Sequence, residues 1–150
     1  MPFDIEESMN NERLINTLKR HEGFRQRPYQ DTMNILTVGY GRNLEINGIS
    51  EKEAEYLLIQ DITRISHEIW DVLPIFDQLC SPRQEVLVNM VYNLGMDGLL
   101  NFRKMLAALA NGLYTLAADE MLHSLWSRQV GSRSFELAKV MELGVWEKSN

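Results

Sequence analysis

The chain of 150 residues lacks several features that would place it in an oxidising compartment or in a membrane. It contains one cysteine, Cys80, so no disulfide can form within the chain and no oxidising compartment is implied. No apolar run is long enough to cross a bilayer. The first eight residues are acidic and lack the basic segment and apolar core of a signal peptide. We therefore expect a protein made in the cytoplasm without a signal peptide.

Basic residues are also in the minority. The chain has 15 lysines and arginines against 21 acidic residues, for a net charge of −6. It has no Cys/His cluster, no glycine-rich phosphate loop and no extended basic face, so we expect no metal, no nucleotide, no cofactor and no nucleic-acid partner. The chain nevertheless contains local basic groups, such as Lys19 with Arg20 and Arg25 with Arg27.

One segment near the N-terminus carries closely spaced polar residues. Glu22, Asp31 and Thr37 follow the pattern Glu-x8-Asp-x5-Thr, and Gly39 and Gly41 come directly after them. Two carboxyl groups with a hydroxyl that positions water are the minimum equipment for hydrolysing a glycosidic bond. Each residue alone has a plainer interpretation, because a glutamate at a helix end is usually solvated and an aspartate at a turn usually caps it.

Local patterns predict where these residues lie. Apolar residues at helical spacing predict a helix over Asn10 to Arg20, which Gly23 is expected to end. Glu22 would then lie on the last turn. The strand-forming residues that follow predict a β-hairpin, with Asp31 where a strand meets the turn and Thr37 on the returning strand. The two glycines would permit close approach of the backbone to the helix end.

The rest of the chain predicts helices. Ser50 and Glu53 form a capping box for a long helix that runs to about Val72. Ser81 is expected to cap a second, largely apolar helix, with Gln84 reaching back to its start. Further helices are predicted at 103–111, 113–125 and 133–143.

These elements predict an α+β fold in one domain over residues 1–150. A small N-terminal lobe with the β-hairpin, about 10–50, would be joined by the connecting helix, about 50–72, to a larger all-helical C-terminal lobe, about 75–150. A cleft between two lobes is a natural site for a sugar chain.

The spaced Glu22, Asp31 and Thr37, with both glycines, resemble the catalytic segment of the phage-type lysozymes. These are endolysins that cut peptidoglycan between N-acetylmuramic acid and N-acetylglucosamine, and the likeness extends over about residues 10–147. The resemblance implies a lysozyme-like fold and an inverting muramidase, with Glu22 as general acid and Asp31 and Thr37 positioning water. It also implies a monomer that reaches the cell wall or periplasm through a separate membrane pore, a holin.

The resemblance implies further site residues in the C-terminal lobe. Arg133 matches a position where an arginine approaches the catalytic glutamate, although a surface arginine at a helix start is an equal alternative. Asn93 matches a cleft position that hydrogen-bonds sugar, or is a satisfied amide near a helix end. Tyr92 lines the cleft or fills the core, and we favour the core. The three tryptophans are interpreted as core residues: Trp70, Trp126 and Trp146.

The sequence departs from the larger members of this family in three ways. The connection to the long helix, from Arg42 to Ile49, is short where those members carry a helix and a longer loop, which predicts a more open cleft. Arg42 stands where histidine is common, and we predict that it pairs with Asp61. The net negative charge predicts weak attraction to an anionic cell wall.

Two alternatives to a muramidase stay open. A lytic transglycosylase also needs an acid/base glutamate but forms an anhydro product without water, and the presence of Asp31 and Thr37 counts against it. The other alternative is a lysozyme-like domain with little or no catalysis, retained for binding glycan or a protein partner. The acidic charge and the shortened N-terminal lobe favour that alternative.

Overall fold

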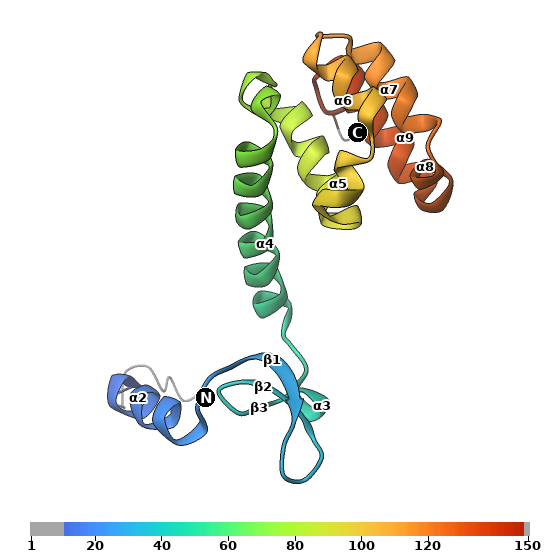
Figure 1. Ribbon diagram of the computed structural model, residues 1–150. Helices are drawn as coiled ribbons and strands as arrows, with labels where there is room; N and C mark the ends of the chain where they lie inside the picture. Colours follow the sequence, from blue (N-terminus) through green and yellow to red (C-terminus); the bar gives the residue numbers. More distant parts are fainter. Residues whose placement is uncertain (1–10, 149–150) are drawn as a thin grey trace. The chain divides into compact units, whose positions relative to one another are not determined.

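The computed structural model describes residues 11–148, which divide into two compact units that meet between Glu55 and Tyr56 (Figure 1). That boundary falls inside a long helix. The acidic start of the chain, on which the expected absence of a signal peptide depends, lies outside the described residues, as does Asn10, where the first helix was predicted to begin.

The first unit combines a helix with a small antiparallel sheet. Its elements are α2 (Asn11–Glu22), β1 (Arg25–Gln30), β2 (Leu36–Gly39), β3 (Arg42–Asn43) and α3 (Leu44–Asn47). The strands follow the order β1-β2-β3, with Thr37 paired to Tyr29 on one side and to Asn43 on the other. The predicted hairpin is thus confirmed. The short connection from Arg42 to Ile49 contains the helix α3, which was not predicted, and Asn43 caps it by accepting a hydrogen bond from the Ile46 N–H.

Helix α2 ends where the sequence predicted. Gly23 has φ 71°, and its N–H donates to the carbonyl of Lys19 at 3.0 Å, which is a glycine-type helix end. The apolar side chains of α2 are 41–49% exposed, so the first unit does not bury the face that the sequence predicted as internal. Among the described residues of this unit, only Thr37 is buried.

The predicted capping box is present at the start of α4 (Glu51–Val72). The Ser50 N–H donates to the Glu53 carboxylate at 2.7 Å, and the Glu53 N–H donates to the Ser50 hydroxyl at 3.2 Å. Arg42 pairs with the same carboxylate at 3.1 Å. The Ser50 N–H, and to a lesser degree the charge of Arg42, hold the pKa of Glu53 below its usual value of 4.5.

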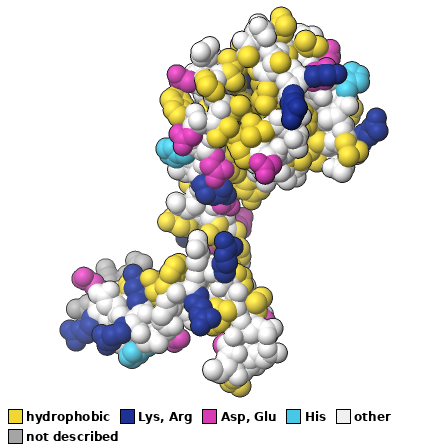
Figure 2. Space-filling view, viewed as in Figure 1, with side chains coloured by type: hydrophobic (Ala, Val, Ile, Leu, Met, Phe, Trp, Pro, Cys, Tyr) yellow, Lys and Arg dark blue, Asp and Glu magenta, His cyan; other side chains and the backbone are white. Residues whose placement is uncertain are grey.

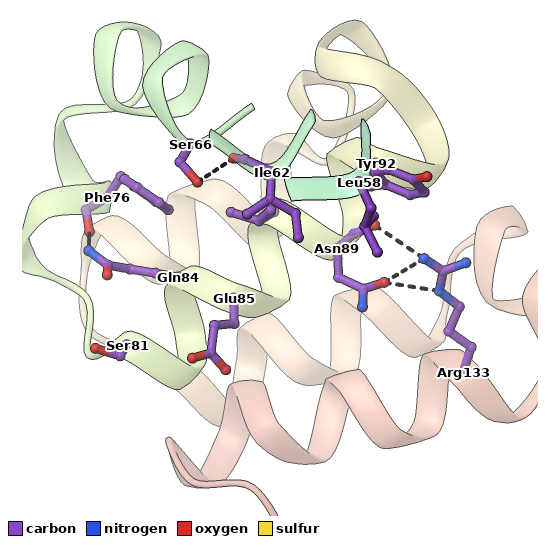
Figure 3. Close-up of a pocket in the computed structure, with 11 residues that line it drawn as sticks. Leu58, Ile62, Ser66, Phe76, Ser81, Gln84, Glu85, Asn89, Tyr92 and Arg133 are labelled. Atoms are coloured by element: carbon purple, nitrogen blue, oxygen red, sulfur yellow. Dashed lines mark hydrogen bonds between the residues drawn. The ribbon is translucent and has the colours of Figure 1, made fainter. Parts of the chain in front are cut away.

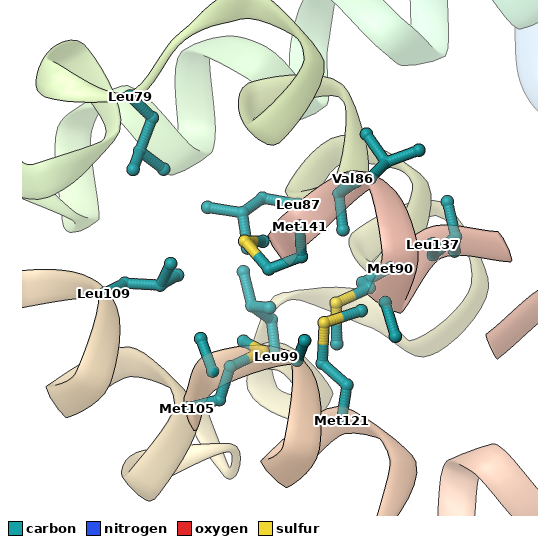
Figure 4. Close-up of a cluster of buried hydrophobic side chains, with 14 of the residues drawn as sticks. Leu79, Val86, Leu87, Met90, Leu99, Met105, Leu109, Met121, Leu137 and Met141 are labelled. Carbon is teal, nitrogen blue, oxygen red and sulfur yellow. The ribbon is translucent and has the colours of Figure 1, made fainter. Parts of the chain in front are cut away.

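The second unit is all helical. After α4 it contains the 3₁₀ helix η1 (Pro74–Gln78), α5 (Ser81–Leu100), α6 (Arg103–Ala110), α7 (Tyr114–Leu122), α8 (Leu125–Val130) and α9 (Ser132–Leu143). Its core contains fully buried side chains from α5, α6, α7 and α9, among them Leu87, Met90, Leu99, Met105, Leu109, Met121, Leu137 and Met141 (Figure 4). Burial of each such side chain stabilises the fold by about 1.5–3 kcal/mol. None of the helices within residues 11–148 combines the length and hydropathy needed to span a bilayer.

The long helix contributes less to this core than its sequence predicted. Its apolar residues at helical spacing predict an inner face made of Ala54, Leu57, Leu58, Ile62, Ile65 and Ile69. Of these, Ile65 and Ile69 are buried, whereas Leu57, Leu58 and Ile62 are 40–50% exposed. The burial therefore begins only in the second half of α4, where Ile65 and Ile69 join the core of the second unit.

Two helix starts differ from the prediction. Cys80 rather than Ser81 is the N-terminal cap of α5, and the Gln84 side chain donates to the Phe76 carbonyl at 2.8 Å instead of reaching back to the start of its own helix. The amide thus ties η1 to α5.

Two helix breaks were missed. The helix predicted at 113–125 is interrupted after Leu122, because the Ser124 hydroxyl accepts a hydrogen bond from the Ser127 N–H at 3.1 Å and begins α8. Within α5, Gly95 has φ 77° and ψ 168°, which kinks the helix.

The capping box generates a prediction about pH. Replacing Glu53 by glutamine should lower the melting temperature at pH 7. Because the folded-state pKa of Glu53 lies below its usual value, the stabilisation from its carboxylate is complete above pH 4.5 and is lost as the pH falls through the folded-state pKa. Thermal unfolding of both proteins between pH 7 and acid should therefore show converging melting temperatures. Glu55→Gln removes a carboxylate outside the capping box and is the control for the loss of one charge, and a constant difference for Glu53→Gln would contradict the assignment.

Candidate functional site

Glu22 lies at the end of α2, and its side chain lies directly against the backbone of Gly41. A Cβ atom on Gly41 would lie 2.4 Å from the Glu22 Oε2 atom, closer than real atoms approach one another. Gly41 also has φ 69°, a left-handed conformation that favours glycine. Gly39 has φ 67°, but a Cβ there would meet nothing within 4 Å. Gly41 therefore makes the close approach expected from the sequence, whereas Gly39 serves only the backbone turn.

Asp31 organises the turn of the hairpin through one of its two carboxylate oxygens. Oδ1 accepts hydrogen bonds from the N–H groups of Met33 at 2.8 Å and Ile35 at 2.9 Å. The backbone closes the same loop, because the Asp31 N–H donates to the Ile35 carbonyl at 3.0 Å. Within residues 11–148, no hydrogen bond reaches the other oxygen, Oδ2. The side chain is thus held rigidly while one oxygen remains available to a ligand.

Thr37 is the one buried residue in the described part of the first unit, with 3% of its surface exposed. Its hydroxyl donates to the Ile35 carbonyl at 2.9 Å, and its backbone is held between neighbouring strands. Since the hydroxyl hydrogen is already used, the side chain can offer only acceptor lone pairs to a further partner.

The predicted pairing of Arg42 with Asp61 is wrong. Arg42 pairs with Glu53 at 3.1 Å, and its Nε atom donates to the Gly48 carbonyl at 3.0 Å. Asp61 pairs instead with Arg64 at 3.3 Å, one turn along the same helix. The capping box fixes the Glu53 carboxylate at the start of α4, next to the loop that Arg42 also binds. Arg42 and Asp61 therefore each pair with a residue closer in the chain than the partner that was predicted.

In the second unit, Arg133 is held by Asn89. Its Nε and Nη2 atoms donate to the Asn89 Oδ1 atom at 3.0 and 2.5 Å, and Nη2 also lies 3.4 Å from the Asn89 carbonyl oxygen (Figure 3). Asn89 is neutral, and no acidic residue in the described part of the chain pairs with Arg133. The guanidinium is thus oriented without being neutralised. Sequence reasoning missed Asn89, although it lies four residues before Asn93 and therefore on the same side of α5.

Arg133 and Asn89 lie on the wall of an open pocket of about 580 Å³ in the second unit (Figure 3). Helices α4, α5 and α9 and the 3₁₀ helix η1 contribute its lining, which includes the apolar Leu58 and Ile62. Tyr92 also lines this pocket and is 51% exposed, so the preference for a core position was wrong. The ring of Tyr92 faces outward because the buried side of α5 is occupied by Met90 and Val91.

Asn93 is connected to the core through Trp126. The Trp126 Nε1 atom donates to the Asn93 Oδ1 atom at 2.9 Å, and the ring packs edge-on against Phe102 with centroids 6.0 Å apart. The oxygen of the amide is therefore satisfied, while its NH₂ group has no partner among residues 11–148. Trp126 is buried as predicted, whereas Trp70 and Trp146 are 54% and 40% exposed, so their assignment to the core was wrong.

The Asn89–Arg133 bonds can be tested by a double-mutant cycle. Hydrogen bonds to a charged group are among the stronger ones, so the free energy of unfolding should show a coupling of about 1–2 kcal/mol between Asn89→Ala and Arg133→Ala. Denaturant unfolding of the two single variants and the double variant measures it. The pair Asn89→Ala and Arg128→Ala provides the control and should be additive. Additivity in both pairs would show that Asn89 does not hold Arg133.

Comparison with known proteins places this site in a family. The chain matches the phage lysozyme family over residues 19–140, a range that includes Glu22, Asp31, Thr37, Asn93 and Arg133. It is 27% identical over 156 residues to probable T4-type lysozyme 1 of Dictyostelium discoideum, covering 85% of this chain and 92% of that protein.

Two phage proteins are also similar. An endolysin of Acyrthosiphon pisum secondary endosymbiont phage 1 is 29% identical over 114 residues, which cover 74% of this chain and 75% of the endolysin. The pre-baseplate central spike protein Gp5 of Enterobacteria phage T4 is 26% identical over 172 residues, which cover 96% of this chain but 29% of the spike protein. Since the family match includes most of both units and all three spaced residues of the motif, the chain belongs to the phage lysozyme family of glycoside hydrolases.

Proposed function

We propose that this chain is a muramidase that hydrolyses the β-1,4 bond between N-acetylmuramic acid and N-acetylglucosamine with inversion at the anomeric carbon. The observation that carries the proposal is the contact between the Glu22 carboxyl and Gly41, in the same unit as Asp31 and Thr37. A catalytic acid must be brought to the place where the bond breaks, and the exposed Glu22 side chain lies against the Gly41 backbone without forming an ion pair among the described residues.

In this mechanism Glu22 is the general acid. Its proton passes to the glycosidic oxygen as the bond from that oxygen to the anomeric carbon breaks, and the leaving sugar departs as an alcohol. Positive charge develops on the ring of the sugar that retains the anomeric carbon. The Asp31 carboxylate stabilises this charge, since its position is fixed by the N–H groups of the turn.

Thr37 and Asp31 position the attacking water. The Thr37 hydroxyl has already donated its hydrogen to Ile35, so a water must donate one hydrogen to it, and the second hydrogen can go to Asp31 Oδ2. A lone pair of the water oxygen then remains for attack on the anomeric carbon, and Asp31 accepts the released proton. Attack opposite the leaving group inverts the centre, and an intervening water requires carboxyl groups about 6.5–9.5 Å apart.

The second unit supplies substrate-binding groups. The un-neutralised guanidinium of Arg133 suits a carboxylate of the substrate, and the free NH₂ of Asn93 suits a sugar hydroxyl or acetamido oxygen. The exposed ring of Tyr92 offers an apolar surface to a sugar. We propose that the enzyme works as a monomer without a cofactor and reaches the wall or periplasm through a separate pore.

Digestion of purified peptidoglycan by the wild type and by Glu22→Gln tests the reaction. Loss of a general acid should lower turnover by about 10²–10⁴-fold. Mass spectrometry should identify hydrated, reducing muropeptides from the wild type, and NMR should show the α anomer first. Anhydro products would indicate a transglycosylase instead. No products from either protein, with binding to the wall intact, would indicate a binding domain without catalysis.

Two glycine variants separate the position of Glu22 from the stability of the turn. Gly39→Ala and Gly41→Ala each place a side chain at a positive φ, so each should lower the free energy of unfolding by about 1–2 kcal/mol. Only Gly41→Ala should displace the Glu22 carboxyl, and a displacement of about 1 Å costs about 100-fold in turnover. Denaturant unfolding and turnover of peptidoglycan measure the two effects. Equal turnover in both variants would contradict the proposed role of the contact.

A further inference from the structure

The first unit carries a group of cations that form no ion pair with any described acidic residue. Lys19 and Arg20 lie on the last turn of α2, and Arg25 and Arg27 lie on β1, all of them exposed. No acidic group within residues 11–148 pairs with any of these four, although Arg42, Arg64 and Lys139 do form ion pairs. Figure 2 shows Lys and Arg side chains gathered over α2 and next to it. This concentration is unusual in a chain whose net charge is −6.

Aromatic rings restrict the positions of two of these cations. The Lys19 ammonium lies 5.4 Å from the centre of the Tyr40 ring, and the Arg25 guanidinium lies 4.3 Å from the centre of the Tyr29 ring. Phe24 packs against Tyr40 with centroids 5.5 Å apart and is 65% exposed. Cations and partly exposed aromatic rings therefore lie next to one another. We call the set Lys19, Arg20, Phe24, Arg25, Arg27 and Tyr40 the basic–aromatic surface.

This surface begins at the Glu22 carboxyl. Glu22 lies between Arg20 and Phe24 in the chain, and its carboxyl touches Gly41, the residue that follows Tyr40. A polymer bound with a bond at Glu22 would therefore lie on the same unit that carries these cations and rings.

We propose that the basic–aromatic surface binds the peptidoglycan strand next to the scissile bond through the carboxylates of its peptide stems. This inference rests on the proposed function. An arginine fork matches a carboxylate bidentately, and Phe24 offers an apolar surface to the face of a sugar ring. A chain of net negative charge is repelled by such a polymer at long range, but screening limits that repulsion to about 8 Å at physiological salt. Locally unpaired cations then dominate contact with the strand.

Binding can be measured without turnover in a Glu22→Gln background, by co-sedimentation with purified peptidoglycan from which attached polymers have been removed. Adding Arg25→Gln and Arg27→Gln should weaken binding about tenfold at low salt and reduce its salt dependence. Arg103→Gln with Lys104→Gln, in the second unit, removes the same charge and should leave binding unchanged. Circular dichroism and melting temperature confirm that each variant is folded.

Chemical amidation of the stem carboxylates tests the partner. On amidated peptidoglycan the Glu22→Gln protein should bind as weakly as its Arg25/Arg27 variant, and the two should no longer differ. Equal weakening by both pairs of substitutions would show that net charge alone is involved. A difference that persists after amidation, or that requires attached phosphate polymers, would overturn the assignment to stem carboxylates. Because this test measures binding, it can fail while wild-type digestion still yields hydrated products, and it can succeed if digestion fails.

Discussion

The contact between Glu22 and Gly41 is the constraint on which the site in the first unit depends. The Glu22 side chain, at the end of a helix, lies so close to the Gly41 backbone that a Cβ atom there would have to displace its carboxyl. Gly23 ends α2 immediately after Glu22, and the backbone turn around Gly39 and Gly41 sets where the sheet passes the carboxyl. Gly41 therefore determines how closely the Glu22 carboxyl approaches the sheet, whereas Gly39 contributes only to the backbone turn.

Charged groups in this molecule differ in how they are held. Around the capping box, acidic and basic groups neutralise one another, as Arg42 and Glu53 do. Arg133 is instead oriented by a neutral amide, and the cations near the end of α2 lie on aromatic rings. A charged group that is oriented without a countercharge can still attract a ligand of opposite charge. The net charge of the chain does not reveal such groups.

The sequence predicted those features that depend on near neighbours in the chain. The capping box of Ser50 and Glu53, the end of α2 and the hairpin are of this kind, and all are present. Predictions failed where a pairing or the burial of a side chain depends on residues far away in the chain. Arg42 had several acidic residues within plausible reach, and the burial of Trp70 or Tyr92 depends on which helices surround it. The local sequence pattern also did not predict the kink at Gly95, because glycine is tolerated inside many helices.

The position of the unit boundary inside α4 has a consequence for how the protein unfolds. The first turn of that helix is capped by groups of the first unit, whereas Ile65 and Ile69 belong to the core of the second. Since helix formation is cooperative along the chain, fraying that starts at the cap can propagate toward that core. Unfolding of the two units should therefore be coupled through α4. Loss of order in one unit should reduce hydrogen-exchange protection in the other.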